Sequence, residues 1–397
     1  MSSTMGESEP EADAPVIDDG GNPRRLRSPR ARRARLPVVF GATSIALLMV
    51  VGFPGAGGTG GSPTASPAVI GTTASSAANN SSCPTLNLPT PICHVVVLYL
   101  ENQNVTWVLK HAPFERWLTT KYAFAAQYYS VMHYSFPNYI AATSGVATNL
   151  IRTVPEYPNA SRYDLSELLT MHSPSLTWHD YSGAEPTNCS RVSTKNYKPA
   201  HNPFVYYSEI WDNKSECKLL DVGLPTWNTT ERAGATSTYS FVAPNLTDDC
   251  YAGVVSCDSW LKGWLSPVIN ESVFKSSVVF LTYDESTKFD NSSGIPGVKG
   301  GGHIYMAAVS PFACAGYQST TVYNDFDLLT TTEWLLGLGH TGMNDNWTQH
   351  PPMKDLFCFP SGSGGGSGRP ASTAASAIPL PALERRRSDS TPVRQIP

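Results

Sequence analysis

The run 94–100, His-Val-Val-Val-Leu-Tyr-Leu, is nearly continuous in β-branched, aliphatic and aromatic residues and ends directly at Glu101-Asn102. Such an unbroken apolar run is typical of a strand that is buried on both faces, as strands of parallel sheets are. A second run of this kind, 276–283 (SSVVFLTY), ends at Asp284-Glu285, and 303–309 is a third candidate strand. These runs predict the centre of a sheet.

Helical patterns lie between and after these runs, at 113–122, 165–171, 258–265 and 325–338. Strands interleaved with helices predict an α/β layered domain with a central, mostly parallel sheet flanked by helices. Ligands of such sheets bind where the strands end, at their carboxyl edge. The polar residues that follow the apolar runs are therefore the candidates for chemistry.

Composition places this domain in the middle of the chain. The 397 residues are 41% hydrophobic with a formal net charge of −4. Seven of the 28 basic residues precede residue 36 and five follow residue 361, whereas eight of the 32 acidic residues lie in the same tails, which leaves about −8 for the middle. This charge argues against a nucleic-acid partner.

The N-terminal region predicts export. Seven Arg within 1–35, which we expect to be a disordered cytoplasmic tail, precede the uncharged segment 36–53 (LPVVFGATSIALLMVVGF). Its length is the short limit for a bilayer span, and the positive flank places the N-terminus inside. We expect either an anchored single-pass protein at the cell surface or, if 36–53 is cleaved as a signal peptide, a secreted one. A low-complexity linker follows at 54–82.

Cysteines and glycosylation signals agree with export. All eight Cys follow the apolar segment, an even number that predicts disulfides, and none shows the paired spacing of a zinc site. Spacing alone leaves the pairing open, although Cys83 with Cys93 and Cys250 with Cys257 suggest local loops. Asn-x-Ser/Thr signals predict a glycoprotein; they begin at Asn79, Asn80, Asn104, Asn159, Asn188, Asn213, Asn228, Asn245, Asn270, Asn291 and Asn346. The tail 361–397, rich in Ser, Gly, Pro and Ala, predicts disorder, so the folded domain spans 83–360.

Two strand ends each deliver adjacent oxygen-bearing side chains to one edge, Glu101-Asn102 and Asp284-Glu285. Hard divalent cations prefer such ligands. One such pair alone is more simply explained as the solvated end of a strand. Two pairs at the same edge favour a metal site.

A candidate nucleophile lies between the two pairs. In 133–145 (HYSFPNYIAATSG), Ser135 precedes a run of small residues that could begin a helix. Backbone N–H groups at a helix N-terminus can hold a phosphate, and a nearby cation makes a serine hydroxyl easier to ionise. A simple N-cap serine explains the spacing equally well.

These residues carry a resemblance. Seven motifs occur in order between about residues 93 and 340: HVVVLYLEN, HYSFPNYIAATSG, TWHDY, HNPFVYY, PNLTDD with CDSWLKGWL, VVFLTYDE and GGGH. Together they resemble the phosphoesterase family of bacterial acid phosphatases and phospholipases C, within the alkaline phosphatase superfamily. The resemblance implies an alkaline-phosphatase-like domain over 83–360 that hydrolyses phosphate esters.

The resemblance also implies roles for individual residues. Glu101, Asn102, Asp284 and Glu285 would bind one divalent metal ion (Mg, Ca, Mn or Zn), together with Ser135 as the nucleophile that becomes phosphorylated. Asn138 would bind a phosphoryl oxygen. His201 of HNPF and His303 of GGGH would line the pocket as oxygen-binding or proton-donating groups.

This chain departs from the family at two histidines. Relatives often have a His two positions after the Asp of the PN segment, where Tyr251 follows Asp249 here, and another shortly before the last helix, where this chain has Asp325. A proton donor would then be sought among the remaining pocket candidates, which are His133, His179, His201 and His303.

Three functions follow from these observations. The first is hydrolysis of phosphate monoesters through a phosphoserine. The second keeps the site but cleaves phosphodiesters, as phospholipase C does, with a membrane lipid as substrate. The third is a non-catalytic, glycosylated surface protein on the same fold, which the missing histidines favour and the retained Ser135 and acidic pairs oppose.

Overall fold

The structure, a computed structural model, describes residues 83, 85–148, 164–231 and 236–360. The predicted cytoplasmic tail 1–35, the apolar segment 36–53, the linker 54–82 and the tail 361–397 lie outside the described residues. Among the described helices, none is long and apolar enough to cross a bilayer.

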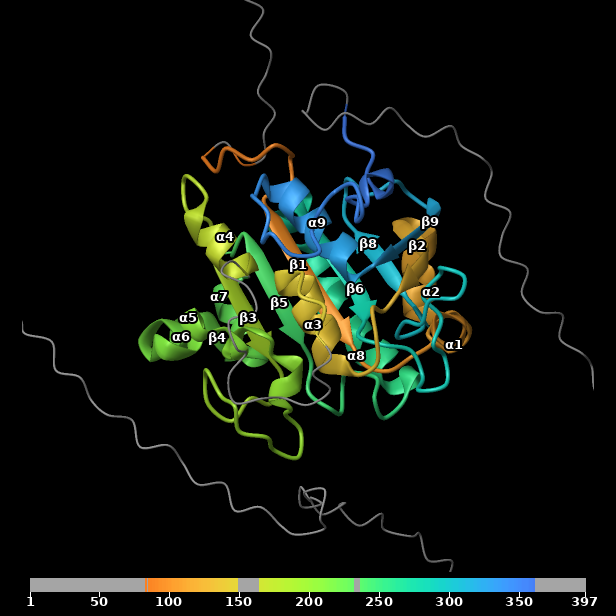
Figure 1. The fold of residues 1–397 in the computed structure, drawn as a ribbon, viewed down its shortest axis with the longest axis horizontal. Helices are drawn as coiled ribbons and strands as arrows, with labels where there is room; N and C mark the ends of the chain where they lie inside the picture. Colours follow the sequence, from red (N-terminus) through yellow and green to blue (C-terminus); the bar gives the residue numbers. More distant parts are fainter. Residues whose placement is uncertain (1–82, 84, 149–163, 232–235, 361–397) are drawn as a thin grey trace, which may run out of the picture. The chain divides into compact units, whose positions relative to one another are not determined.

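Within the described residues, nine strands form one sheet (Figure 1). In the order β4-β3-β5-β1-β6-β8-β2-β7, with β9 paired to β2, they are Asp221–Gly223, Trp178–Ser182, Tyr239–Ala243, His94–Leu100, Ser277–Tyr283, Met306–Val309, Ala123–Tyr129, His303–Ile304 and Gln318–Asn324. β1 lies at the centre, parallel to both β5 and β6. β8 and β7 are antiparallel to their neighbours, so the sheet is mixed but mostly parallel. The predicted fold class is confirmed.

Successive side chains of each strand point to opposite faces of the sheet, and helices cover both faces. Tyr99 of β1 packs edge-on against Tyr139 and donates to Asp325, and so faces α3 (Ser135–Ser144) and α9 (Asp325–Leu336). Tyr283 of β6 points the other way and donates to Glu115 of α2 (Pro113–Lys121). α2 packs beside α8 (Val254–Asn270), since Asp258 accepts from the first backbone N–H groups of α2.

The remaining helices are short and lie in the connections. They are α1 (Val105–His111), α4 (Leu165–Met171), α5 (Ser208–Asp212), α6 (Lys214–Leu220) and α7 (Trp227–Thr230), with 3₁₀ turns at Pro199–His201, Phe204–Tyr206, Leu224–Thr226, Ser272–Ser276 and Lys354–Leu356. The predicted helix 165–171 matches α4, whereas 258–265 is the middle of the longer α8.

All eight cysteines form disulfides, which confirms that prediction and settles the pairing. The pairs are Cys83–Cys93, Cys189–Cys217, Cys250–Cys257 and Cys314–Cys358. The first and third are the local loops suggested by spacing. Glycosylation of the Asn-x-Ser/Thr signals stays a prediction.

Candidate active site

The two predicted acidic pairs meet because β1 and β6 are parallel neighbours in matched register. Leu100 pairs with Tyr283, so the next residues, Glu101 and Asp284, leave the sheet side by side. The Asp284 backbone N–H still donates to the Leu100 carbonyl at 2.9 Å. Both side chains are buried. Two carboxylates are thereby held together at the carboxyl edge of the central strands.

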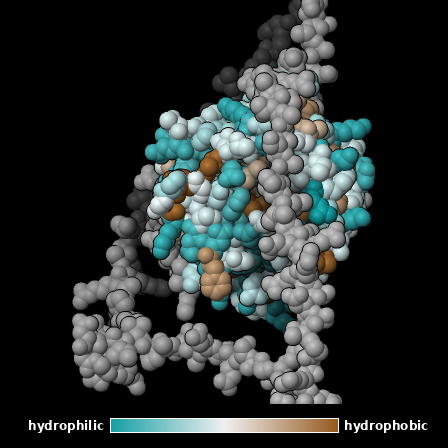
Figure 2. Space-filling view, turned by 90° about the vertical axis from the view of Figure 1, so that its right-hand side faces the viewer, coloured by the Kyte–Doolittle hydropathy of each residue, from teal (hydrophilic) through white to brown (hydrophobic). Residues whose placement is uncertain are grey.

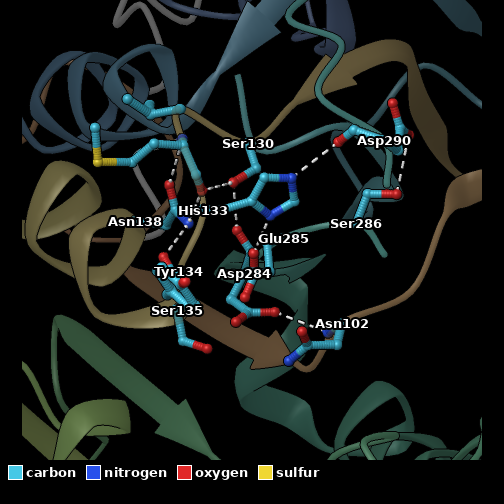
Figure 3. A network of polar contacts seen from close by, with 12 residues as sticks. Asn102, Ser130, His133, Tyr134, Ser135, Asn138, Asp284, Glu285, Ser286 and Asp290 are labelled. Carbon is cyan, nitrogen blue, oxygen red and sulfur yellow. Dashed lines mark hydrogen bonds and ion pairs between the residues drawn. The ribbon is translucent and has the colours of Figure 1, made fainter. Parts of the chain in front are cut away.

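Asn102 hydrogen-bonds to both of these carboxylates. Its backbone is left-handed (φ 57°), a conformation that asparagine tolerates better than most residues. The turn aims its backbone N–H at Asp284 Oδ1 at 2.8 Å (Figure 3). Its side-chain amide donates to Glu101 Oε2 at 2.5 Å, so that one residue bridges both carboxylates.

Ser135 is the first residue of α3, and its hydroxyl does not cap the helix. The N-cap position belongs to Tyr134, which makes no side-chain capping bond. Ser135 Oγ instead donates to Glu101 Oε2 at 3.3 Å. The open backbone N–H groups of the first turn surround the same place. The geometry therefore favours the nucleophile interpretation of Ser135 over the N-cap interpretation.

Asn138 is not placed as the resemblance implied. Its amide N–H groups donate to the carbonyls of Met132 (2.7 Å) and Tyr134 (2.9 Å), and its Oδ1 accepts from the Met132 N–H (3.1 Å). Both amide donors are therefore used within the chain, and none remains for a phosphoryl oxygen. Asn138 instead shapes the segment that presents Ser135 (Figure 3).

Glu285 is also turned away from the Glu101–Asp284 pair. Its Oε2 pairs with His133 Nδ1, and the other ring nitrogen of His133 lies 3.0 Å from the Asp290 carbonyl. Glu285 thus follows Asp284 in sequence but pairs with His133, which in turn contacts the loop 286–302. Burial raises its pKa, against the lowering effect of His133.

Glu101 collects further contacts from α3 and from the 3₁₀ turn Pro199–His201. Tyr139 donates to Oε1 at 2.5 Å, and His201 Nε2 lies 3.3 Å from the same oxygen. Burial lowers the pKa of His201 to about 4. Of the four histidines considered as proton donors, His201 is the one that contacts Glu101.

The other two histidines lie elsewhere. His303 Nε2 bonds to the Ala126 carbonyl (2.9 Å), and its ring stacks on Tyr129, so the structure does not bring it to Ser135. His179 Nδ1 bonds to the Ser237 hydroxyl at 2.6 Å.

The glycines of GGGH have a packing role instead. A Cβ at Gly301 would lie 2.2 Å from the Met132 carbonyl oxygen, and Gly302 has a positive φ of 95°. Only glycine lets the loop 286–302 pass so close to the segment before Ser135.

Asp249 is a site residue that the strand-end reasoning missed. It follows β5, the other neighbour of β1, and its carbonyl accepts the Glu101 N–H at 2.6 Å. Its side chain is buried, and Oδ2 has no hydrogen-bond partner. Burial raises its pKa to about 6. The PNLTDD motif contained the signal, but β5 had not been recognised as a strand.

Asp325 lies next to the site and accepts hydrogen bonds from the strands and the segment around it. It accepts from the hydroxyls of Tyr99 (2.8 Å) and Tyr128 (3.1 Å) and from the Val131 N–H (3.3 Å). Asp325, at the position where the resemblance implied a histidine, therefore joins β1, β2 and the segment that leads to Ser135, and each of its oxygens accepts a hydrogen bond.

The residues at this edge fit a divalent cation. Asp284 Oδ2 is buried without a hydrogen-bond partner, beside the buried carboxylate of Glu101. Burial raises the pKa of Glu101 to about 8, with Asp249 and Glu285 adding to the shift against a bond from Tyr139 that lowers it. Two adjoining buried carboxylates require a compensating positive charge. Glu101, Asp284, Asn102 and Ser135 form an oxygen-rich set that suits one.

A second group of buried acids lies away from this site. Asp180 of β3 and Asp221 of β4 are register partners, and both side chains are fully buried. Asp180 Oδ1 and Asp221 Oδ2 have no hydrogen-bond partner. Burial raises the pKa of Asp221 to about 7 and raises that of Asp180 well above its usual range, with Asp221 adding to the shift.

We expect this pair to make the protein less stable at alkaline pH. Unfolded aspartate has a pKa of about 4, so the native state holds extra protons above that pH. The stabilisation is complete below about pH 4 and is lost as pH rises through 7. Asp180→Asn imitates the protonated acid, so its Tm should fall less than the wild-type Tm between pH 5 and pH 8. Equal pH dependence of the two Tm curves would contradict this. Asp212→Asn, on the surface of α5, is the control.

Comparison with known proteins identifies the family of this chain. The model of the family described as "Phosphoesterase family" matches residues 99–339. A phosphatidylinositol-3-phosphatase of Mycobacterium tuberculosis is 31% identical over 277 residues, which cover 68% of this chain and 84% of the relative. An acid phosphatase of Aspergillus fumigatus is 25% identical over 251 residues, which cover 58% of this chain and 52% of the relative. The chain thus spans about half the length of that fungal enzyme.

One similar solved structure is a protein of the alkaline phosphatase superfamily from Vibrio parahaemolyticus. It is 12% identical with a TM-score of 0.46, and the match covers 64% of this chain and 69% of that one. The family assignment itself comes from the sequence matches, and the matched range 99–339 contains the residues of the candidate site. As its motifs predicted, the chain belongs to the phosphoesterase family.

Proposed function

We propose that this chain is an exported, metal-dependent phosphoesterase that hydrolyses phosphate monoesters through a phosphoserine at Ser135. The observation that carries the proposal is the position of Ser135 Oγ, at the N-terminus of α3 and 3.3 Å from Glu101 Oε2. Two relatives are named acid phosphatase and phosphatidylinositol-3-phosphatase, and both names describe monoester hydrolysis.

Glu101, Asp284, Asn102 and Ser135 would hold one divalent cation. When bound, it neutralises charge on the phosphoryl group and favours ionisation of the serine hydroxyl. An oxygen-rich set favours Mg²⁺, Mn²⁺ or Ca²⁺, because Zn²⁺ more often takes histidine ligands. In this arrangement Glu285 is not part of the ligand set, because it pairs with His133 in the segment before Ser135.

The reaction has two displacements. Ser135 Oγ attacks phosphorus, the ester P–O bond breaks, and the alcohol leaves with a proton. Water then attacks the phosphoserine, the P–Oγ bond breaks, and inorganic phosphate and the serine hydroxyl are regenerated. Because burial lowers the pKa of His201 to about 4, we assign its uncharged ring, which lies against Glu101, to binding a substrate oxygen. The leaving alcohol then takes its proton from water. The α3 N-terminus supplies backbone N–H groups for the phosphoryl oxygens.

Export is part of the proposal. Disulfides form and persist in oxidising compartments, and all cysteines of this chain are paired. The Arg-rich N-terminus and the apolar segment 36–53 favour an anchored surface protein with the N-terminus inside, or a secreted one after cleavage. Glycosylation at the Asn-x-Ser/Thr signals would follow in a compartment that performs it.

A phosphoinositide is the second candidate substrate, since one relative is named a phosphatidylinositol-3-phosphatase and the match covers 84% of that relative. The loop after Glu285 also exposes Phe289, Ile295 and Val298, with Lys288 among them. On the face visible in Figure 2, hydrophobic residues form small separate groups among hydrophilic ones. Contact with a lipid would therefore be local to this loop, beside the site.

The test compares p-nitrophenyl phosphate with bis-p-nitrophenyl phosphate as substrates of the purified chain, from pH 4 to pH 9, with EDTA and metal add-back. We expect release from the monoester that EDTA abolishes and metal restores. Preference for the diester would support the phospholipase-like alternative. No release from either by folded, metal-loaded protein would support the non-catalytic surface protein.

A further inference from the structure

A histidine and two carboxylates gather at the far end of α9 from Asp325. Glu333 belongs to the last turn of α9, and His340 and Asp345 follow in the next segment. One donor atom of each lies within 4.8 Å of the others. Asp325, which adjoins the active site, is eight residues away along the helix, or roughly 12 Å. The group is therefore separate from Ser135 and its partners.

The group contains a carboxylate oxygen that the chain leaves unpartnered. Glu333 is fully buried, and its Oε1 has no hydrogen-bond partner. Its Oε2 lies 2.9 Å from His340 Nδ1 and accepts from Trp347 Nε1 at 3.3 Å. Burying an oxygen without a donor costs on the order of 1–3 kcal/mol. A ligand that the chain itself does not supply would remove this cost.

The group also lacks a fixed positive charge. Asp345 is 2% exposed, and its Oδ2 lies 3.9 Å from His340 Nδ1. Among the described residues, neither carboxylate pairs with Lys or Arg; the nearby Lys354 instead lies over the rings of Trp334 and Trp347. Apart from His340, the described residues therefore supply no positive charge beside these two buried carboxylates.

We propose that Glu333, His340 and Asp345 form a second metal site, which binds one divalent transition-metal ion. An imidazole nitrogen with two carboxylates is a mixed donor set, which suits Zn²⁺ better than the oxygen-preferring Mg²⁺ or Ca²⁺. The His340 side chain is 48% exposed, so an ion can reach the site from solvent. Zn²⁺ would supply the missing positive charge and satisfy the unpartnered oxygen of Glu333.

The site would serve stability, because of what its segment touches. Thr341 and Gly342 donate to Asp345, and the neighbouring Asn344 donates through its backbone and its side chain to the Gly145 carbonyl, both at 2.9 Å. Gly145 is the C-cap of α3, the helix that begins at Ser135. A metal at Glu333 would thus fix the segment that holds the far end of the nucleophile helix.

The experiment titrates Zn²⁺ into the full chain carrying Asp284→Asn, which disables the first metal site. Calorimetry should show about one equivalent bound, and Zn²⁺ should raise Tm. Adding His340→Asn should weaken that binding at least ~10-fold and remove the Tm shift. Adding His350→Asn is the matched control, because His350 lies 3.6 Å from Asp327 and packs on Phe326 but does not belong to the Glu333 group, and it should leave both unchanged.

Cobalt provides an independent measurement. Co²⁺ bound in the Asp284→Asn background should give visible absorption bands that disappear with His340→Asn and persist with His350→Asn. Absence of Zn²⁺ binding in the Asp284→Asn chain, or equal binding by the His340→Asn and His350→Asn chains, would overturn the proposal. Because the readouts are affinity, Tm and absorption, the result does not depend on phosphoesterase activity.

Discussion

Ser135→Ala should reduce hydrolysis of p-nitrophenyl phosphate at least ~10³-fold, because Ser135 carries the alcohol hydroxyl at the α3 N-terminus that contacts Glu101. The other α3 hydroxyl at Glu101 is the phenol of Tyr139, which is buried one turn further along the helix. The fold should survive, since the Ser135 hydroxyl makes no capping bond. Circular dichroism and Tm should match the wild type, while incubation with a labelled monoester should no longer leave phosphate on the protein.

Ser144→Ala is the matched control for this change. It removes a hydroxyl from the same helix, where Ser144 Oγ donates only to the Ile140 carbonyl and accepts a long bond from the Val146 N–H. Turnover should stay near the wild-type level. Hydrolysis and protein labelling that persist in Ser135→Ala would show that another residue is the nucleophile.

Asp284→Asn should reduce turnover by ~10²-fold or more and remove the response to the catalytic metal. The substitution keeps the shape of the side chain but takes one negative charge from the Glu101–Asp284 pair. In the wild type, addition of Mg²⁺ or Mn²⁺ after EDTA should raise Tm, since a ligand that binds the native state stabilises it. The Tm of the variant should not respond to these ions.

Asp164→Asn is the control for loss of a buried aspartate. Asp164 is fully buried, has one unpartnered oxygen and caps α4, a role that asparagine also performs. It should keep both turnover and the metal-induced Tm shift. If Asp284→Asn retained the full metal response, the proposed ligand set would be wrong.

The central strands could be predicted because burial on both faces leaves a continuous apolar run in the sequence. The outer strands could not. β9 (QSTTVYN) is polar and half-exposed, and β4 is only three residues long. The candidate 303–309 divides into β7 and β8 around Tyr305, whose carbonyl is taken by the Thr282 hydroxyl. α8 continues beyond the predicted end and includes Pro267 in its last turn.

In the candidate site, too, some residues could be placed from the sequence and others could not. Glu101 and Asp284 could be placed together because strand order and register alone fix them. The directions of Asn138 and Glu285 depend on tertiary partners, the 132–134 segment and His133, which no local pattern reveals. Asp249 was missed because its strand was missed.

The Cys250–Cys257 disulfide has a consequence for where the enzyme can work. It closes the short loop that begins beside Asp249, whose carbonyl holds the Glu101 backbone. A reductant such as dithiothreitol should therefore lower turnover, and reoxidation should restore it. If the chain is exported, as we propose, this support for Glu101 would be missing while the chain is still in a reducing cytoplasm. A newly made chain would then spare the phosphate esters of its own cell and gain full activity only outside it.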